Sequence, residues 1–376
     1  MFSIIGAGIG GLTTALMFEK LNIPYQLYEK AKQPNAIGAG IWLAPNALKV
    51  LEFCGVLDAV FEAGNEVDRI TLTNEKLEAL ADSSQIPAKK KYGFTTVAIH
   101  RARLQHVLVK ALPKEKMIWN KGFSHYTKNE SGLTIHFEDK STHHTDFLIA
   151  ADGINSKVRQ QLFPESQIRY SGQTCWRGVS PNPLPEAFKH RGCELWGKGI
   201  RFGFSQLNDA ETSWFAVKKA EGFGVDEPLT LKKELLELYK EFHDIPKELI
   251  SETPIEAILR NDITDLKPLQ NWFQDKVLLM GDAAHATTPN MGQGGAQAIE
   301  DAYYLGHYIK SNPEHAFSVF QNKRYKRVNN IVKQSWFTGK IAHFSTLASL
   351  RNFVFKQLPK ALVDKNMHSV YQLKDL

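Results

Sequence analysis

The chain has 376 residues, of which 43% are hydrophobic, 23% charged and 11% aromatic. This composition is typical of a globular protein and excludes disordered, collagen-like and coiled-coil chains, and the length predicts two domains. The formal charge of +6 is dispersed along the chain, so no basic stripe indicates a nucleic-acid partner.

No run approaches the roughly 18 to 20 apolar residues that span a bilayer, and the first residues lack the basic region of a signal peptide. We therefore expect a cytoplasmic protein. The three cysteines are far apart and form no CxxC spacing, which predicts reduced thiols and no metal site. A triple run of lysines at 89–91 is interpreted as part of a solvated loop.

In chain order, the pattern predicts an α/β fold. A strand over 2–5, a helix over 10–21 and a strand over 25–28 form a β-α-β unit that opens a doubly wound sheet. Further helices are expected over 46–61 and 103–112, and further strands within 67–99 and over 117–126, 133–137 and 146–151.

The second half of the chain has a different texture. Between 170 and 265, short aromatic-rich strands such as 201–205 and 213–217 predict a separate mixed sheet inserted into the first domain. After one more strand over 277–280, the remainder is expected to be mainly helical.

A glycine-rich loop joins the first strand to the first helix. Gly6, Gly8 and Gly11 form a GxGxxG pattern, in which the glycines permit a tight turn, close approach of a pyrophosphate and close helix–strand packing. Glu29 ends the second strand, where a carboxylate accepts hydrogen bonds from ribose hydroxyls. Together these features predict a dinucleotide site, but they do not separate FAD from NAD.

Two distant segments favour FAD. Residues 148–159, which contain Asp152 followed by glycine, resemble the DG motif of flavin-dependent monooxygenases, and residues 277–302, which contain Asp282 after glycine, resemble their GD motif. All three fingerprints occur in the family's order. The chain is therefore similar, over about residues 1–335, to single-component class A FAD-dependent aromatic hydroxylases, which include salicylate and p-hydroxybenzoate hydroxylases, zeaxanthin epoxidase and tetracycline-inactivating monooxygenases.

The family's cofactor contacts carry over to the positions that match its motifs. The resemblance implies that Asp282 holds the ribityl chain of FAD, that Asp152 and Arg159 serve the pyrophosphate region, and that Arg101 contacts a phosphate or ribose. The other implied contacts are Pro289 at the ring face, Gly292, Gly294 and Gly295 as donors to the reduced flavin, and Lys30 near the adenosine. His285 is interpreted as structural.

The resemblance also implies the domain organisation. We expect a Rossmann-like FAD-binding domain over 1–169 plus 266–335, an inserted mixed β-sheet substrate domain over 170–265 and a C-terminal helical segment over 336–376. Because only one glycine fingerprint occurs, no second Rossmann domain is available for a nicotinamide cofactor. The oligomeric state is expected to be a monomer or a homodimer.

The implied reaction is a monooxygenation. In the family, NADPH or NADH visits transiently to reduce a noncovalently bound FAD, and a flavin C4a-hydroperoxide transfers one oxygen atom of O2 to an aromatic or unsaturated small molecule. An FAD-binding module or oxidoreductase without oxygenation is the alternative. A halogenase is disfavoured, since no WxWxIP motif occurs.

Candidate substrate contacts lie in the aromatic-rich sheet, and strand alternation predicts that only some of them face the flavin. They are Trp176, Arg201, Phe202, Phe204, Trp214 and Phe215. Arg201 would suit an anionic substrate.

A basic amphipathic helix is expected within 340–362. Its apolar face comprises Leu347, Leu350, Val354 and Leu358. Such a face either rests on a membrane surface or packs against the protein body, and we expect packing without membrane contact because amphipathic helices usually bury their apolar face internally.

Overall fold

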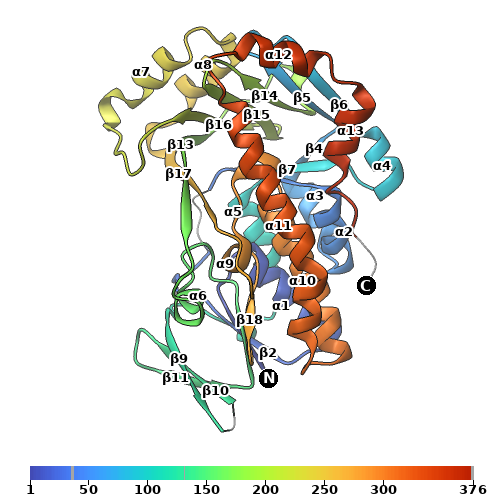
Figure 1. The fold of residues 1–376 in the computed structure, drawn as a ribbon, viewed down its shortest axis with the longest axis vertical. Helices are drawn as coiled ribbons and strands as arrows, with labels where there is room; N and C mark the ends of the chain where they lie inside the picture. Colours follow the sequence, from blue (N-terminus) through green and yellow to red (C-terminus); the bar gives the residue numbers. More distant parts are fainter. Residues whose placement is uncertain (35–37, 131, 374–376) are drawn as a thin grey trace.

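The computed structural model describes residues 1–34, 38–130 and 132–373, so the last three residues of the expected C-terminal segment lie outside it. Two large sheets lie toward opposite ends of the molecule's long axis, and helix α11 (Ala316–Ala342) runs alongside both of them (Figure 1). The expected α/β class, with C-terminal helices, is confirmed.

The first sheet has six strands in the order β18-β19-β12-β1-β2-β8. Its strands are parallel except that β18 runs antiparallel to β19. Their bounds are Phe2–Ile5 for β1, Tyr25–Tyr28 for β2, Met117–Ile118 for β8, Phe147–Ala150 for β12, Phe273–Gln274 for β18 and Val277–Leu279 for β19. The central strands are buried on both faces, which explains their continuous apolar sequences.

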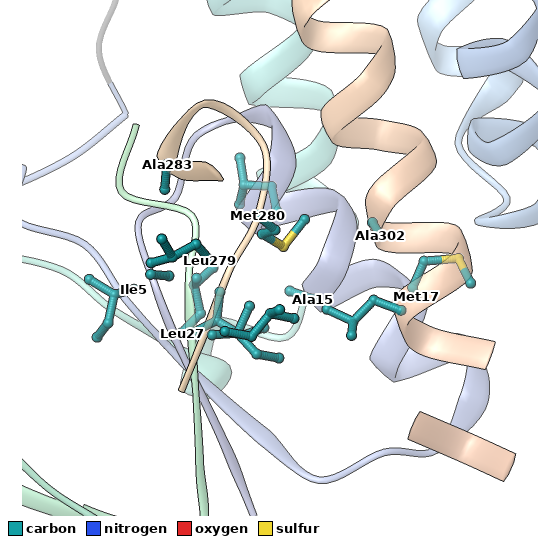
Figure 2. Close-up of a cluster of buried hydrophobic side chains, with 14 of the residues drawn as sticks. Ile5, Ala15, Met17, Leu27, Leu279, Met280, Ala283 and Ala302 are labelled. Atoms are coloured by element: carbon teal, nitrogen blue, oxygen red, sulfur yellow. The ribbon is translucent and has the colours of Figure 1, made fainter. Parts of the chain in front are cut away.

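Two helices cover one face of this sheet. Helix α1 (Ile9–Leu21) and helix α10 (Gly294–Ser311) pack against each other, and the small residues Ala15 and Ala302 of these helices are fully buried. Figure 2 shows these two alanines on their helices and the sheet residues Leu27 and Leu279 on their strands, all in one buried cluster. Helix α1 ends at Asn22, whose φ of 52° gives the left-handed C-cap that glycine often supplies.

The second sheet has seven strands in the order β17-β13-β16-β15-β14-β5-β6. Their bounds are Arg69–Asn74 for β5, Ala79–Ser84 for β6, Ile168–Ser180 for β13, Arg191–Trp196 for β14, Ile200–Asn208 for β15, Glu211–Lys219 for β16 and Leu259–Leu266 for β17. Helices α7 (Pro228–Leu238) and α8 (Asp244–Glu252) cover one face. Strands β5 and β6 precede the segment 170–265 that is expected to form the substrate domain, and they join this sheet because β5 pairs with β14 and β6 pairs with β5.

Two small three-stranded sheets complete the β-structure of the described residues. One contains β3 (Gly40–Leu43), β4 (Gly64–Val67) and β7 (Thr96–His100), and the other contains β9 (Phe123–Asn129), β10 (Gly132–Phe137) and β11 (Thr142–Thr145). Helix α5 (Arg101–Lys110) follows β7 directly, and helix α6 (Lys157–Leu162) follows β12 after a short loop. Helix α5 packs on α1.

Two sequence predictions are wrong in this region. The helix expected over 46–61 is split into α2 (Pro45–Phe53) and α3 (Leu57–Ala63), because Gly55 adopts a φ of 77° that a right-handed helix does not allow. The lysines at 89–91 are exposed, as expected, but they lie on helix α4 (Ile86–Tyr92) rather than in a loop.

The C-terminal helices α12 (Ala348–Lys356) and α13 (Lys360–His368) follow α11. Against expectation, Leu347, Leu350 and Val354 point to solvent, while Ala348 and Arg351 form the buried side of α12. Arg351 occupies the inner position because it donates hydrogen bonds to three main-chain carbonyl groups of the body. No helix among the described residues is long and apolar enough to cross a bilayer.

Candidate functional site: strand ends of the six-stranded sheet

The candidate site forms at the carboxyl ends of four adjacent parallel strands. In the register of the sheet, Ile5 of β1 pairs with Tyr28 of β2 and with Ala150 of β12, and Ala150 also pairs with Leu279 of β19. The segments that leave these strands therefore start side by side. They carry the glycine loop, Glu29, Asp152 and Asp282, at the edge where open α/β sheets bind ligands.

The glycine loop has two close backbone contacts and one open position. A Cβ atom on Gly11 would lie 1.9 Å from the carbonyl oxygen of Gly6, and one on Gly6 would lie 2.5 Å from the carbonyl oxygen of Ala151. A Cβ on Gly8 would meet nothing within 4 Å. The loop thus has the tight packing predicted for the first and third glycines, and it presents bare backbone at the second.

Glu29 is fixed at the entrance of the loop. Its two carboxylate oxygens accept hydrogen bonds from the backbone N–H of Ala7, at 2.7 Å, and of Ala31, at 2.9 Å. Lys30 is exposed beside it. This geometry directs a carboxylate to the place where a dinucleotide's adenosine ribose would lie.

Asp152 and Arg159 have different environments. Asp152 Oδ1 is buried and has no hydrogen-bond partner among the described residues, and burial raises the pKa of this carboxyl group. Arg159 is buried and donates to the carbonyl oxygens of Ile154, at 2.5 Å, and Ala283, at 3.2 Å. Arg159 therefore ties the loop after β12 to the segment after β19, and its guanidinium does not point into the open part of the site.

Asp282 begins the short helix α9 (Asp282–His285) after β19. Its side chain reaches solvent, but the many protein atoms around the carboxyl group remove part of its hydration and so raise its pKa. The charges of His285 and Arg101 oppose this rise. Arg101, the exposed first residue of α5, is thereby brought to the same site. Gln105, which sequence reasoning missed, donates to the carbonyl oxygen of Ala7 at 2.8 Å and so anchors α5 to the glycine loop.

The start of α10 lies beside the glycine loop. A Cβ on Gly295 would lie 3.9 Å from the side chain of Ile9, and Gly294 is the first helical residue. The preceding turn η4 (Pro289–Met291) begins with the exposed Pro289 and ends at Gly292, which has a φ of 61° and open space around it. The free N–H groups of this helix end suit a negatively charged ligand group.

These residues fit FAD. Gly8, Gly153 and Gly292 leave a cradle in which a Cβ would meet no atom within 4 Å, and Asp152 keeps a buried carboxylate oxygen for a donor. Glu29 and Asp282, at opposite sides of the glycine loop's strand, supply carboxylates for hydroxyl groups. The arrangement therefore offers acceptors for ribose and ribityl hydroxyls and backbone donors for phosphates.

The six candidate substrate residues divide between the two faces of the seven-stranded sheet. Trp176, Phe202, Phe204 and Trp214 lie in the core between the sheet and helices α7 and α8, so the structure does not bring them to the first domain. A cavity of about 580 Å³ beside Trp176 is on that same face, lined by α7. The cause is strand alternation, which sends neighbouring residues to opposite faces.

Arg201 and Phe215 point from the other face. Arg201 is buried, pairs with Glu194 at 3.1 Å and donates to the side-chain oxygen of Asn290 in η4. Phe215 lies against Gly203 of the neighbouring strand, where any Cβ would be 2.3 Å from its ring. The bond between Arg201 and Asn290 joins this face directly to the loop that carries Pro289 and Gly292.

Comparison with known proteins identifies the family. The model of the FAD binding domain family matches residues 2–316. Aurachin C monooxygenase/isomerase of Stigmatella aurantiaca is 36% identical over 344 residues, covering 91% of this chain and 89% of that protein. This chain belongs to the FAD-dependent monooxygenase family.

Further relatives of this monooxygenase support the assignment. The 2-heptyl-3-hydroxy-4(1H)-quinolone synthase of Pseudomonas aeruginosa is 32% identical over 95% of this chain and 94% of its own length. The solved structure of Klebsiella pneumoniae HpxO with FAD and uric acid has a TM-score of 0.91 at 26% identity, over 99% of this chain and 96% of that one. The expected resemblance to class A flavin monooxygenases is confirmed.

The monooxygenase also has a buried ionic network that sequence reasoning did not predict. His285 Nε2 lies 2.6 Å from Asp301, and Arg324 of α11 bonds to Asp301 at 2.8 Å and also pairs with Glu300. Arg327 pairs with Glu300 at 2.8 Å. Burial alone raises the pKa of Asp301, but the charges of His285 and Arg324 hold it below its usual value.

This network stabilises the segment 277–302, which contains the GD motif. Asp301 also accepts a hydrogen bond from the backbone N–H of Gly281, at 2.9 Å, and so fixes the residue before Asp282. His285 is fully engaged with Asp301, which favours the structural interpretation of this histidine. The adjacent acids Glu300 and Asp301 on α10 were the available signal, since buried carboxylates require partners such as Arg324.

Proposed function

We propose that the chain uses NADPH or NADH to reduce bound FAD and inserts one oxygen atom from O2 into a planar aromatic or unsaturated small molecule. FAD supplies the oxygen-activating chemistry when bound. The chain's own residues bind the cofactor, orient the substrate and exclude water. Within this proposal Asp282, Asp152, Arg101 and Glu29 hold FAD, and Arg159 positions the two loops that hold it.

One observation carries the proposal. Arg201, on the face of the seven-stranded sheet opposite α7 and α8, bonds to Asn290 in the turn between Pro289 and Gly292. The face available for a substrate and the loop assigned to the flavin ring thus meet through one hydrogen bond. A molecule bound against Phe215 would then lie between the sheet and the cofactor.

The polar groups on this face suit a heteroaromatic substrate. Arg201 Nε and Gln173 Oε1 are buried and have no hydrogen-bond partner among the described residues, while Gln173 Nε2 donates to the carbonyl oxygen of Gly339. Together they offer one donor and one acceptor, since a guanidinium only donates and an amide oxygen accepts. A ring that carries both a carbonyl group and an N–H group would satisfy both.

The relatives favour the same chemical class. The names of the two proteins that are 36% and 32% identical refer to aurachin C and to a heptyl-substituted hydroxyquinolone. We therefore propose a quinolone-like substrate, a flat ring system with a ring N–H, a carbonyl group and an apolar substituent. Arg201 would then donate to the carbonyl oxygen of the substrate rather than pair with a carboxylate group of the substrate.

The test combines cofactor analysis with turnover. We expect purified protein to release FAD on heating and to oxidise NADH or NADPH faster when a 4-quinolone is added, with a product heavier by one oxygen atom. Substrate-stimulated NAD(P)H oxidation that yields only hydrogen peroxide would favour a flavin oxidoreductase without oxygenation. Stimulation by salicylate or another aromatic acid instead of quinolones would reject the substrate class but not the reaction.

A further inference from the structure

The chain contains a long segment without acidic residues. From Ala316 to Val363 there is no aspartate or glutamate. The same segment contains nine lysines and arginines, which are Lys323, Arg324, Lys326, Arg327, Lys333, Lys340, Arg351, Lys356 and Lys360. Its positive charge thus exceeds the net +6 of the whole chain, so the rest of the chain is slightly negative.

The same segment exposes a group of large apolar side chains. Six of them, from the end of α11 to the end of α12, are between 48% and 63% exposed. They are Phe337, Phe344, Leu347, Leu350, Phe353 and Val354, and we call them the α12 patch. Single exposed apolar residues are common on proteins, but six of them within residues 337–354 indicate an interaction surface.

The outward direction of the α12 patch is fixed by the inner side of α12. Arg351 donates to the carbonyl oxygens of Ala342, at 2.7 Å, and Gly197, at 3.0 Å, and its guanidinium lies over the ring of Trp196. Leu347, Leu350 and Val354 follow helical spacing on an exposed side of α12 that adjoins Arg351, so rotating α12 far enough to bury them would break these contacts. Figure 1 shows α12 on the outside of the molecule, at the end that holds the seven-stranded sheet.

The cations around the α12 patch reach solvent. Arg324 and Arg327 are used internally by Glu300, and Arg351 is buried, but Lys333, Lys340 and Lys356 are exposed. None of these three lysines forms an ion pair within the part of the chain that the structure describes, although Lys340 lies near the ring of Trp336. Two acids nearby already have partners, since Glu75 interacts electrostatically with Arg351 and Asp364 accepts a hydrogen bond from Ser83.

We propose that the α12 patch docks on the surface of an anionic phospholipid bilayer. Apolar side chains flanked by lysines match the two components of such a surface, because acyl chains accept the apolar groups and lipid phosphates attract the cations. The cores of protein–protein interfaces, by contrast, are depleted in lysine. Charge complementarity therefore selects a lipid surface over a second copy of the chain.

The position of the patch relates it to the substrate face. Phe337 and Phe344 lie on either side of Gly339 in the sequence. The carbonyl oxygen of Gly339 accepts a hydrogen bond from Gln173, and its α-carbon lies close to the side chain of Asn290. Docking would thus bring the bilayer near the end of α11 that borders the substrate face. This link to a lipophilic quinolone substrate rests on the proposed function, whereas docking itself is measured without turnover.

The experiment is cosedimentation of the full-length protein with vesicles made of equal parts phosphatidylglycerol and phosphatidylcholine. We expect binding that weakens in phosphatidylcholine alone and at raised salt. Changing Leu347, Leu350 and Phe353 together to Ser should lower the partition coefficient by about tenfold or more. The matched control changes Phe223, Val225 and Leu229 to Ser, because these side chains are even more exposed but lie outside the patch.

A second pair of variants tests the charge. Changing Lys333, Lys340 and Lys356 to Gln should weaken binding to anionic vesicles, whereas the same change at Lys110, Lys114 and Lys140, which are exposed elsewhere, should have little effect. Absence of binding to anionic vesicles, or equal effects of the patch and control variants, would overturn the proposal. The proposal would also be overturned if light scattering showed a dimer in solution and the variant at Leu347, Leu350 and Phe353 abolished that dimer. Unchanged melting temperatures would show that each variant folds.

Discussion

The backbone of Gly11 lies directly against the carbonyl oxygen of Gly6, so that a Cβ at Gly11 would be 1.9 Å from that oxygen. A Cβ at Gly8, between them, would meet nothing within 4 Å among the described residues other than its chain neighbours. The three glycines of one motif therefore have different physical roles. Gly11 serves the packing of α1 on β1, whereas Gly8 leaves open space beside the loop.

The first prediction separates these roles by two alanine substitutions. Gly11→Ala should prevent correct folding or lower the melting temperature sharply, because the carbonyl group of Gly6 cannot move far enough to make room for the added methyl group. Gly8→Ala should fold normally but bind FAD more weakly, since its methyl group would occupy the space of the pyrophosphate. Thermal unfolding and FAD titration of the apoprotein distinguish the two. Equal FAD affinity of Gly8→Ala and the natural chain would contradict the assigned pyrophosphate position.

The second prediction concerns Asp282. Asp282→Ala should retain the fold and lose FAD affinity by about 1.5 to 3 kcal/mol, the usual value of a hydrogen bond to a charged group. The control is Asp209→Ala, since the Asp209 side chain is 89% exposed and far along the chain from the site. FAD titration by fluorescence is the measurement. A similar affinity for both variants would show that Asp282 does not hold the cofactor.

Most of the six-stranded sheet and its glycine loop could be predicted from the sequence, because their signals are local. The strand over Phe2–Ile5, the glycine loop and the helix that ends at Leu21 follow from apolar runs and glycine spacing, and the observed bounds agree closely. The carboxyl ends of parallel strands then bring Glu29, Asp152 and Asp282 together without further information.

The face of the seven-stranded sheet that carries Arg201 and Phe215 was harder to predict, since it depends on the register of strands that are far apart in the sequence. Trp176 and Arg201 both belong to aromatic-rich strands, yet Arg201 reaches Asn290 in η4 whereas Trp176 packs under α7 and α8. The pairing of β5 with β14 joins segments more than a hundred residues apart, and no local pattern indicates it. The exposed face of α12 was also missed, because hydrophobic periodicity alone does not show which side an arginine such as Arg351 will anchor.

The third prediction tests the buried network under the GD segment. Arg324→Met should destabilise the protein by about 3 to 5 kcal/mol, because Glu300 and Asp301 would both lose a buried partner. Arg327→Met should cost clearly less, since Arg327 is partly exposed and Glu300 would keep Arg324. Urea unfolding of the two variants gives the comparison. Equal losses would mean that Arg324 is not the residue that compensates the buried carboxylates.

The fourth prediction concerns pH. Burial, reinforced by the charge of Arg201, lowers the pKa of His343 to about 3 from an ordinary 6.5. Between these two values the unfolded chain binds a proton that the folded chain does not bind, so this histidine makes stability fall as the pH decreases from 6.5 toward 3. The loss reaches at most about 1.4 kcal/mol per pH unit.

The His343→Asn variant removes this contribution while it keeps a donor for the carbonyl oxygen of Gly339, which His343 contacts at 3.1 Å. Its free energy of unfolding should therefore depend less steeply on pH between 4 and about 6.5 than that of the natural chain. Denaturant unfolding across this range is the check. Parallel pH profiles for the two proteins would refute the lowered pKa.

The most direct measurement of the proposed activity is isotope labelling of the product. Purified enzyme with NADPH or NADH and a 4-quinolone would be incubated under ¹⁸O₂ in ordinary water, and the product would be analysed by mass spectrometry. Oxygen insertion predicts one ¹⁸O atom in the product and none when the label is supplied as H₂¹⁸O. Label that enters from water, or FAD reduction without oxygenated product from any aromatic or unsaturated compound supplied, would contradict a monooxygenase.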